Sequence, residues 1–147
     1  MGDIVAKVND QKETKPTPTL FAPPDLVDDA TYAVISLDLD APFTSWNALS
    51  PIAHWIQTGL KVDQPQQREL KSAEPSIAPW AAAGPPPFAA PHRYVFLLYR
   101  QNAESAIQPD LKDKELAMSQ RMRFDADSMV KQLQLGELVA VNYFVSN

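Results

Sequence analysis

The chain contains no cysteine among its 147 residues. Without thiols, the protein has neither a disulfide framework nor a thiolate ligand for a metal ion, which is the composition that a reducing compartment permits. We therefore take the cytoplasm as the expected location.

Basic residues are scarce and long apolar runs are missing. Thirteen Lys and Arg residues stand against eighteen Asp and Glu residues, which gives a formal net charge of -5. A phosphate backbone would find little to neutralise, so nucleic acid is not an expected partner. No stretch approaches the roughly 18 apolar residues of a spanning helix, and the start lacks the pattern of a signal peptide. We expect no transmembrane segment.

Proline, by contrast, is abundant, with 14 residues. The segment "KETKPTPTLFAPP" combines charge, threonine and proline, and predicts that residues 1–20 form an extended N-terminal arm. The remaining residues, 21–147, are enough for one globular domain and too few for two.

Three segments alternate between faces with the period of two that is typical of β-strands. In residues 32–43, "YAVISLDLDAPF", Ile35 and Leu37 share one face, while Asp38 and Asp40 lie on the other at the polar end. In "IAHWIQTGL", residues 52–60, the same alternation places His54 with the isoleucines and opposite the tryptophan. In "HRYVFLLYRQ", residues 92–101, His92 and Tyr94 share a face. Residues 93–99 are apolar enough for a central strand buried on both faces.

A proline-rich segment, "PWAAAGPPPFAAP" at residues 79–91, separates the second strand from the third. Proline fixes φ and removes a donor, so we expect a stiff loop without regular structure. Towards the end of the chain, Asp125 is a candidate N-cap and Gly136 a candidate C-cap of a short helix, followed by a last strand at residues 138–145.

The residues capable of chemistry are few and fall at strand ends. His54 and His92 are the only histidines, and each stands near the start of a strand, whereas Asp38 and Asp40 stand at the end of another. In an antiparallel sheet these ends meet at one edge, so the four side chains can converge. Each also has a simpler interpretation, since such aspartates often cap turns, a histidine beside tryptophan is often a core residue, and Tyr94 is more often packing than chemistry.

Other site chemistries receive little support. Two His and one or two Asp at long separations lack any short ligand spacing, so we predict no metal site and no cofactor. A serine nucleophile would need a G-x-S-x-G elbow, which is absent.

Taken together, the motifs resemble the phosphatidylethanolamine-binding protein family, also known as the Raf kinase inhibitor protein family. The resemblance rests on "DLDAP" (38–42), "AHWI" (53–56), "GPPP" (84–87), "PHRYVFLLYRQ" (91–101) and the closing "RMRFD" and "LGELVAVNYF". It implies a mostly β, β-sandwich-like fold with a Greek-key central sheet, one or two short helices and a small anion-binding pocket. The residues that it places in the pocket are Asp38, Asp40, Pro42, His54, Pro86, His92 and Tyr94.

Two departures from the family pattern bear on this pocket. Leu39 replaces the proline of the usual D-P-D-A-P motif, which leaves both carboxylates but loosens the backbone around them. Where the family has a glycine-containing turn before "HRY", this chain has Phe88 and two alanines, which we expect at the mouth of the pocket. The preferred ligand is then shifted towards apolar molecules.

Three functions remain open on this basis. The first is a regulatory protein that binds a small anionic or zwitterionic ligand, such as phosphate or a phospholipid headgroup, through imidazolium and phenol donors. The second is a lyase, isomerase or cyclase that uses a His and Asp pair as general acid and base, with Asp38, Asp40, His54 and His92 as catalytic candidates and an apolar small molecule as substrate. The third is a protease or kinase inhibitor that meets a protein partner through its proline-rich surface.

Overall fold

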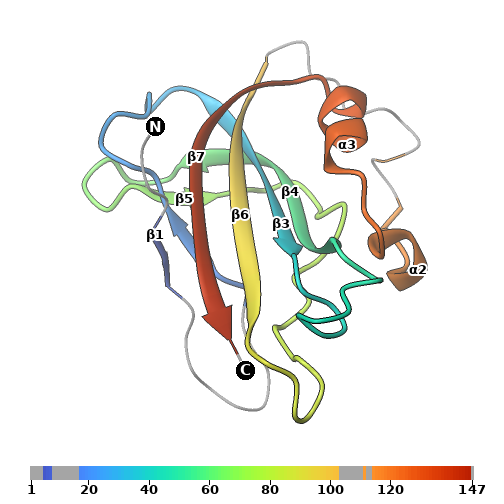
Figure 1. The fold of residues 1–147 in the computed structure, drawn as a ribbon. Helices are drawn as coiled ribbons and strands as arrows, with labels where there is room; N and C mark the ends of the chain where they lie inside the picture. The colour runs from blue at the N-terminus through green and yellow to red at the C-terminus, as the bar shows by residue number, and fades with distance from the viewer. Residues whose placement is uncertain (1–4, 8–16, 103–110, 112–113, 147) are drawn as a thin grey trace.

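A computed structural model describes residues 5–7, 17–102, 111 and 114–146 of the chain (Figure 1). These residues form a sheet of seven strands and two short helices. The strands are β1 Val5–Lys7, β2 Thr19–Phe21, β3 Thr31–Asp38, β4 Ile52–Val62, β5 Glu69–Lys71, β6 His92–Gln101 and β7 Leu135–Ser146. The helices are α2 Met118–Arg121 and α3 Ala126–Gln132.

The strands are ordered β1-β2-β5-β4-β3-β6-β7, and every neighbouring pair is antiparallel. Strands β3, β4 and β5 follow one another, and β6 then returns to lie beside β3, which is the Greek-key arrangement. The sheet curls, so that β5 passes behind β7 in Figure 1 and β1 lies beyond the edge of β7. The mostly β, Greek-key fold expected from the sequence is thereby confirmed.

Two apolar clusters occupy the two faces of the sheet. One lies inside the curl and includes Tyr32, Val34, Phe96 and Leu98. The other packs the opposite face against the helices, and its members are Ile35, Leu37, Ala53, Ile56, Ile77, Ala78, Phe124, Met129 and Leu133. Both clusters take alternate residues from β3, which therefore separates the two cores.

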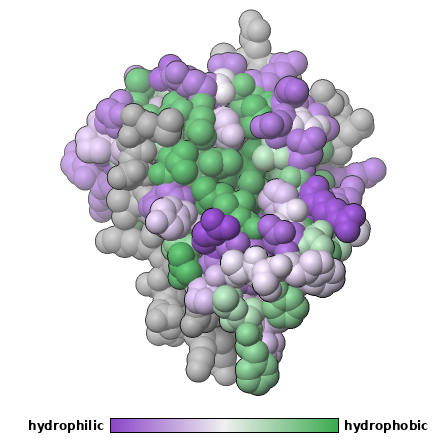
Figure 2. Space-filling view, viewed as in Figure 1, coloured by the Kyte–Doolittle hydropathy of each residue, from purple (hydrophilic) through white to green (hydrophobic). Residues whose placement is uncertain are grey.

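The strand buried on both faces is β3, not β6 as the sequence predicted. In β6, buried residues alternate with residues that are half-buried or, like Arg93, exposed. Figure 2 shows apolar residues across the face of β6 and β7 that is turned to the reader. One face of β6 is thus buried, and the apolar residues on its other face are only partly covered.

Two strands lie within the range that the sequence assigned to an N-terminal arm. Residues Val5–Lys7 pair with Thr19–Phe21, which in turn pair with β5. Leu20 is buried in the inner cluster. Short runs of this kind lack a readable period, and they are strands because a neighbouring edge supplies hydrogen-bonding partners.

The expected helix before the last strand is present, with one boundary that differs. The side chain of Asp125 accepts a hydrogen bond from the backbone N–H of Ser128 at 2.9 Å, which confirms it as the N-cap. Gly136 is not the C-cap, because α3 ends at Gln132 and Gly136 lies inside β7. The left-handed residue after the helix is Gln134, with φ of 50°. A Cβ at Gly136 would lie 3.2 Å from the carbonyl oxygen of Arg100, so this glycine serves close strand packing.

Candidate functional site

Asp38 and His92 come together because β3 and β6 pair antiparallel at this end of the sheet. Asp38 is opposite Tyr94 in the register, two residues from His92. Nδ1 of His92 lies 2.9 Å from Oδ2 of Asp38, and both residues are buried. Because a carboxylate oxygen only accepts, this geometry requires the proton of the neutral imidazole on Nδ1. The second ring nitrogen, Nε2, is then left for another partner.

His54 reaches the same carboxylate because of a bulge in β4. Ser36 pairs with Trp55 but the next residue of β3, Leu37, pairs with Ala53, so His54 is the extra residue. A bulge shifts the alternation of side chains. Ala53 and Ile56 therefore pack in the outer cluster and Trp55 in the inner one, while the His54 ring lies 5.1 Å from that of Tyr94. The sequence prediction that placed His54 with the isoleucines and opposite the tryptophan is wrong.

The His54 ring is held between a loop and the Asp38 carboxylate. Nδ1 donates to the carbonyl oxygen of Ala81 at 2.7 Å, and Nε2 lies 3.9 Å from Oδ2 of Asp38. Burial lowers the pKa of His54 below its usual 6.5, and the opposing effects of the Ala81 carbonyl and Asp38 are smaller. His54 is accordingly neutral at pH 7. The sequence-based view that Asp38 keeps this imidazole protonated is not supported.

Tyr94 completes the cluster as a neutral hydroxyl. Burial raises its pKa above the usual 10.0, and the Asp38 carboxylate, with which the hydroxyl is hydrogen bonded, raises it further. The hydroxyl also has a hydrogen bond to the backbone of Gly84. At physiological pH, Tyr94 therefore keeps its proton, which it donates to the Asp38 carboxylate.

Asp40 is turned towards a different partner. Its carboxylate accepts hydrogen bonds from Nε of Arg93 at 2.8 Å, from Nη2 at 2.7 Å and from the Arg93 backbone N–H at 2.8 Å. The hydrogen bond from the Arg93 side chain holds the pKa of Asp40 below its usual 3.8. Asp40 thus forms a fork-like ion pair and does not share a proton with either histidine.

The proline-rich loop borders the cluster, as its position before β6 suggested. It forms no helix or strand between residues 79 and 91, and Ala81 donates its backbone N–H to the His54 carbonyl at 2.7 Å. Together with the contact of Gly84 to Tyr94, this fixes the loop beside the site. Pro86 belongs to the loop and Pro42 follows the Asp40 segment, and both are half-buried.

Phe88 does not lie over the cluster. Its relative exposure is 106%, and its φ of 69° places it third in a turn closed by a hydrogen bond from Ala89 N–H to the Pro86 carbonyl. A proline second and a positive φ third describe a type II turn. This turn sends the ring into solvent, so the expected apolar mouth is not formed by Phe88.

Two residues near the cluster were missed in the sequence. Trp80 stands 5.9 Å from His54 between ring centroids and stacks on Phe96. Arg121 is 7% exposed, and its positive charge contributes to the lowered pKa of His54. Their segments, the proline-rich loop and α2, have no periodic pattern, and the only signal was the "RMRFD" motif, to which no role could be attached.

We expect Arg121→Met to lower the free energy of unfolding by about 1 to 3 kcal/mol, because two carbonyls lose a charged donor. Arg121 donates from Nε to the Leu116 carbonyl at 3.1 Å and from Nη1 to the Pro79 carbonyl at 2.8 Å. Thermal and urea unfolding measure the effect. The matched control is Arg123→Met, since exposed Arg123 donates to the Ala48 carbonyl at 3.0 Å. Equal stability of the two variants would contradict the bridging role.

Two buried ring nitrogens near the cluster, Nε2 of His92 and Nε1 of Trp80, have no hydrogen-bonding partner among the residues that the structure describes. Buried polar atoms in native proteins are nearly always paired with protein, water or a ligand. Among the described residues, no group of three His, Asp or Glu is arranged to hold a metal ion. Each of these nitrogens therefore has the capacity for one further hydrogen bond.

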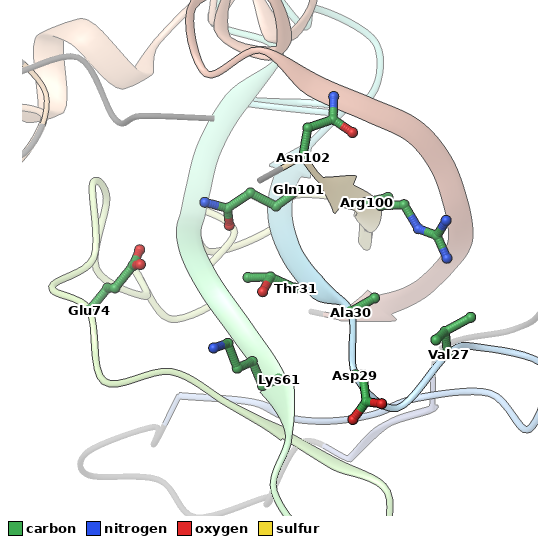
Figure 3. A pocket seen from close by; sticks show the side chains of 9 residues that line it. All are labelled: Val27, Asp29, Ala30, Thr31, Lys61, Glu74, Arg100, Gln101 and Asn102. Carbon is green, nitrogen blue, oxygen red and sulfur yellow. The ribbon is translucent and has the colours of Figure 1, made fainter. Parts of the chain in front are cut away.

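A hollow of about 710 Å³ lies at the other end of the sheet (Figure 3). It includes Thr31 and Gln101, which pair where β3 and β6 meet at the end opposite Asp38. Its lining residues are Val27, Asp29, Ala30, Thr31, Lys61, Glu74, Arg100, Gln101 and Asn102. None of the residues proposed from the sequence lines it, so it is separate from the Asp38 cluster.

Comparison with known proteins gives a direct result. Residues 3–144 match the family model described as phosphatidylethanolamine-binding protein. The chain belongs to this family. The helices of the described part are too short and too polar to span a membrane.

Relatives of the family share only part of their length with this chain. The "Phomoidride biosynthesis cluster protein N" of Talaromyces stipitatus is 29% identical over 115 residues, which are 77% of this chain and 56% of that protein. "CEN-like protein 1" of Nicotiana tabacum is 30% identical over 117 residues, 78% of this chain and 58% of that protein. The chain thus spans less than two thirds of these curated relatives.

A solved structure shares the fold. It is the carboxypeptidase Y inhibitor, determined in complex with its cognate proteinase, with a TM-score of 0.61 and 23% identity. The match covers 90% of this chain and 70% of that chain. At this identity, the likeness establishes the family fold and leaves the function to the residues of the site.

Proposed function

We propose that the protein binds a small oxyanion, phosphate or a phosphorylated headgroup, at the cluster of Asp38, His54, His92 and Tyr94. The observation that carries the proposal is the buried Nε2 of His92, which has no partner although Nδ1 is fixed by Asp38 at 2.9 Å. A fixed ring with one open nitrogen is ready to hydrogen bond a guest. In the neutral Nδ1–H ring this nitrogen is an acceptor, so an oxyanion requires the protonated ring, whose Nε2–H is a charged donor.

Charge neutralisation explains how an anion enters a site that contains two aspartates. Asp40 is neutralised by Arg93 through two side-chain hydrogen bonds. Asp38 accepts from His92 Nδ1 and from the Asp40 backbone N–H at 2.8 Å, so its negative charge is shared among donors. Tyr94 donates its proton to the same Asp38 carboxylate and, below neutral pH, His54 supplies a cation. These groups suffice for an oxyanion without any metal.

The pH dependence of binding tests this proposal. Because burial lowers the pKa of His54 below 6.5, the neutral ring prevails at pH 8 and its protonated fraction grows only as the pH falls. An anion favours that protonated form, so we expect tighter binding at pH 5.5 than at pH 8, with proton uptake on binding. Isothermal titration with sulfate, inorganic phosphate, O-phosphoethanolamine and ethanolamine measures both quantities.

The four probes have separate purposes. Sulfate keeps its charge between the two pH values, so its affinity reports on the protein alone. O-phosphoethanolamine binding more tightly than phosphate would identify a zwitterionic headgroup as the ligand, and ethanolamine alone serves as the control. If none of the anions binds at either pH, the oxyanion proposal is wrong.

General acid-base catalysis on a small molecule is the second candidate. It is favoured by the same pair, since a histidine oriented by a buried carboxylate with its other nitrogen free is the arrangement of a general base. This candidate requires an uncharged substrate, because His54 and Tyr94 are both neutral at pH 7.

A further inference from the structure

Arg93 stands between two members of the cluster in sequence, but its side chain leaves the site. His92 and Tyr94 are buried, whereas the Arg93 side chain is 56% exposed. Its guanidinium nevertheless makes a bidentate contact with a carboxylate that is only 2% exposed, that of Asp40. The exposed Arg93 guanidinium thus neutralises the buried Asp40 carboxylate from the solvent side.

The contact continues into the site through the backbone. The Asp40 backbone N–H donates to Oδ1 of Asp38 at 2.8 Å, and Oδ2 of the same Asp38 faces His92 at 2.9 Å. The backbone N–H of Leu39 also donates to the Arg93 carbonyl at 3.0 Å. The segment that carries both aspartates is therefore fixed to β6 at Arg93, one residue from His92.

We infer that Arg93 is a positioning residue, which acts through Asp40 and Asp38 to hold His92 in its Nδ1–H tautomer with Nε2 open. Without the guanidinium, Asp40 would be a buried charge without a counterion, which is unfavourable enough to make the side chain move or take up a proton. Either response displaces the Asp40 N–H that fixes the Asp38 rotamer. The role for ligand binding rests on the proposed function, whereas the effect on the His92 ring does not.

A purely structural role for the ion pair makes a different prediction. A clamp that only stabilises the segment would lower the stability of an Arg93 variant and leave the His92 tautomer unchanged in the folded protein. The tautomer is measured by long-range 1H–15N correlation of the imidazole at pH 9. An Nδ1–H ring and an Nε2–H ring give distinct patterns of nitrogen shifts.

The experiment compares Arg93→Met, Asp40→Asn and the double variant with wild type. Lys71→Met is the control, because it removes an exposed ion pair to Asp63, with 2.7 Å between Nζ and Oδ2, outside the site. We expect Nδ1–H in wild type and control, and a substantial Nε2–H fraction in the other three. Sulfate binds the protonated ring, in which Asp38 holds Nδ1–H while Nε2–H donates to the anion, so its affinity should fall roughly tenfold in Arg93→Met, where Asp38 no longer holds that ring. The double variant should lose no more than one single variant, because both changes break the same contact.

Further outcomes are decisive for the inference. If Arg93→Met does not fold, Arg93→Lys keeps the charge without the fork and should show a partial shift of the tautomer. Wild-type nitrogen shifts in Arg93→Met, or in Arg93→Lys where only that variant folds, would overturn the inference. If the wild type binds no anion but the tautomer shifts in Arg93→Met, the positioning role stands and the proposed function fails.

Discussion

Replacing Asp38 with alanine is expected to lower the free energy of unfolding by about 3 to 5 kcal/mol, the range for removing one partner of a buried pair. Asp38 is 3% exposed and accepts hydrogen bonds from His92 and from the Asp40 backbone. Its loss leaves both nitrogens of a buried imidazole without a partner, as well as one backbone N–H. Each unpaired buried donor carries its own desolvation penalty.

Urea unfolding measures this effect, and two further variants show its cause. Asp63→Ala removes an exposed aspartate whose ion pair with Lys71 is solvent-accessible, and it should cost about 1 kcal/mol or less. Asp38→Asn keeps an oxygen for the Asp40 N–H and should lie between the two. If Asp38→Ala were no less stable than Asp63→Ala, the buried cluster would contribute nothing to folding.

The sequence identified the four long strands, β3, β4, β6 and β7, because their residues obey a simple period, and it missed the short strands β1, β2 and β5. Tyr32 and Val34 alternate with Ile35 and Leu37 in the sequence, and the two pairs lie in different clusters of the structure. The pairing of the end of β3 with the start of β6 then brings Asp38 to His92. For an antiparallel sheet, this much follows from periodicity alone.

The sequence could not show how His54 and Asp40 are oriented. The bulge at His54 results from the register of β4 against β3 and is not a property of either strand alone. The Asp40 partner, Arg93, lies 53 residues away, and its exposed side chain looks like any solvated arginine. The turn that exposes Phe88 depends on a positive φ, which a phenylalanine rarely adopts. Contacts between residues far apart in the sequence and a strained backbone at a single residue cannot be predicted from the periodic pattern of apolar residues.

These details change the electrostatic description of the site. Judged from residue types, two carboxylates and two imidazoles suggest two ion pairs around a ligand. In the structure, Arg93 neutralises Asp40, and burial holds His54 neutral in spite of Asp38. The charge available to a ligand thus depends on proton uptake by a buried ring. The affinity for an anion therefore depends on pH because burial lowers the pKa of His54, and the number of charged residues in the site does not predict it.

Replacing His92 with alanine is expected to weaken oxyanion binding by about 1.5 to 3 kcal/mol, the range for a hydrogen bond to a charged group. The reason is the loss of the Nε2–H that the protonated ring offers, since Nδ1–H is held by Asp38 and Nε2 has no other partner among the described residues. His54→Ala should reduce the pH dependence without abolishing it, because His92 must also be protonated to donate from Nε2, and it should retain part of the affinity at pH 8, where His54 is neutral. Sulfate titration at both pH values measures the two variants, and Lys71→Ala, outside the site, should bind as wild type does.

The same variants separate a binding protein from an enzyme. In a binding protein, the loss of the hydrogen-bond donor lowers the affinity for the anion, and the protein catalyses no reaction. In an acid-base enzyme, His92→Ala would abolish turnover of an uncharged substrate while its affinity changed little, since proton transfer matters mainly in the transition state. Unchanged sulfate affinity in His92→Ala would show that the open nitrogen is not the anion donor. The His92 and Asp38 pair would then be better explained as a general base, whose function is to move a proton.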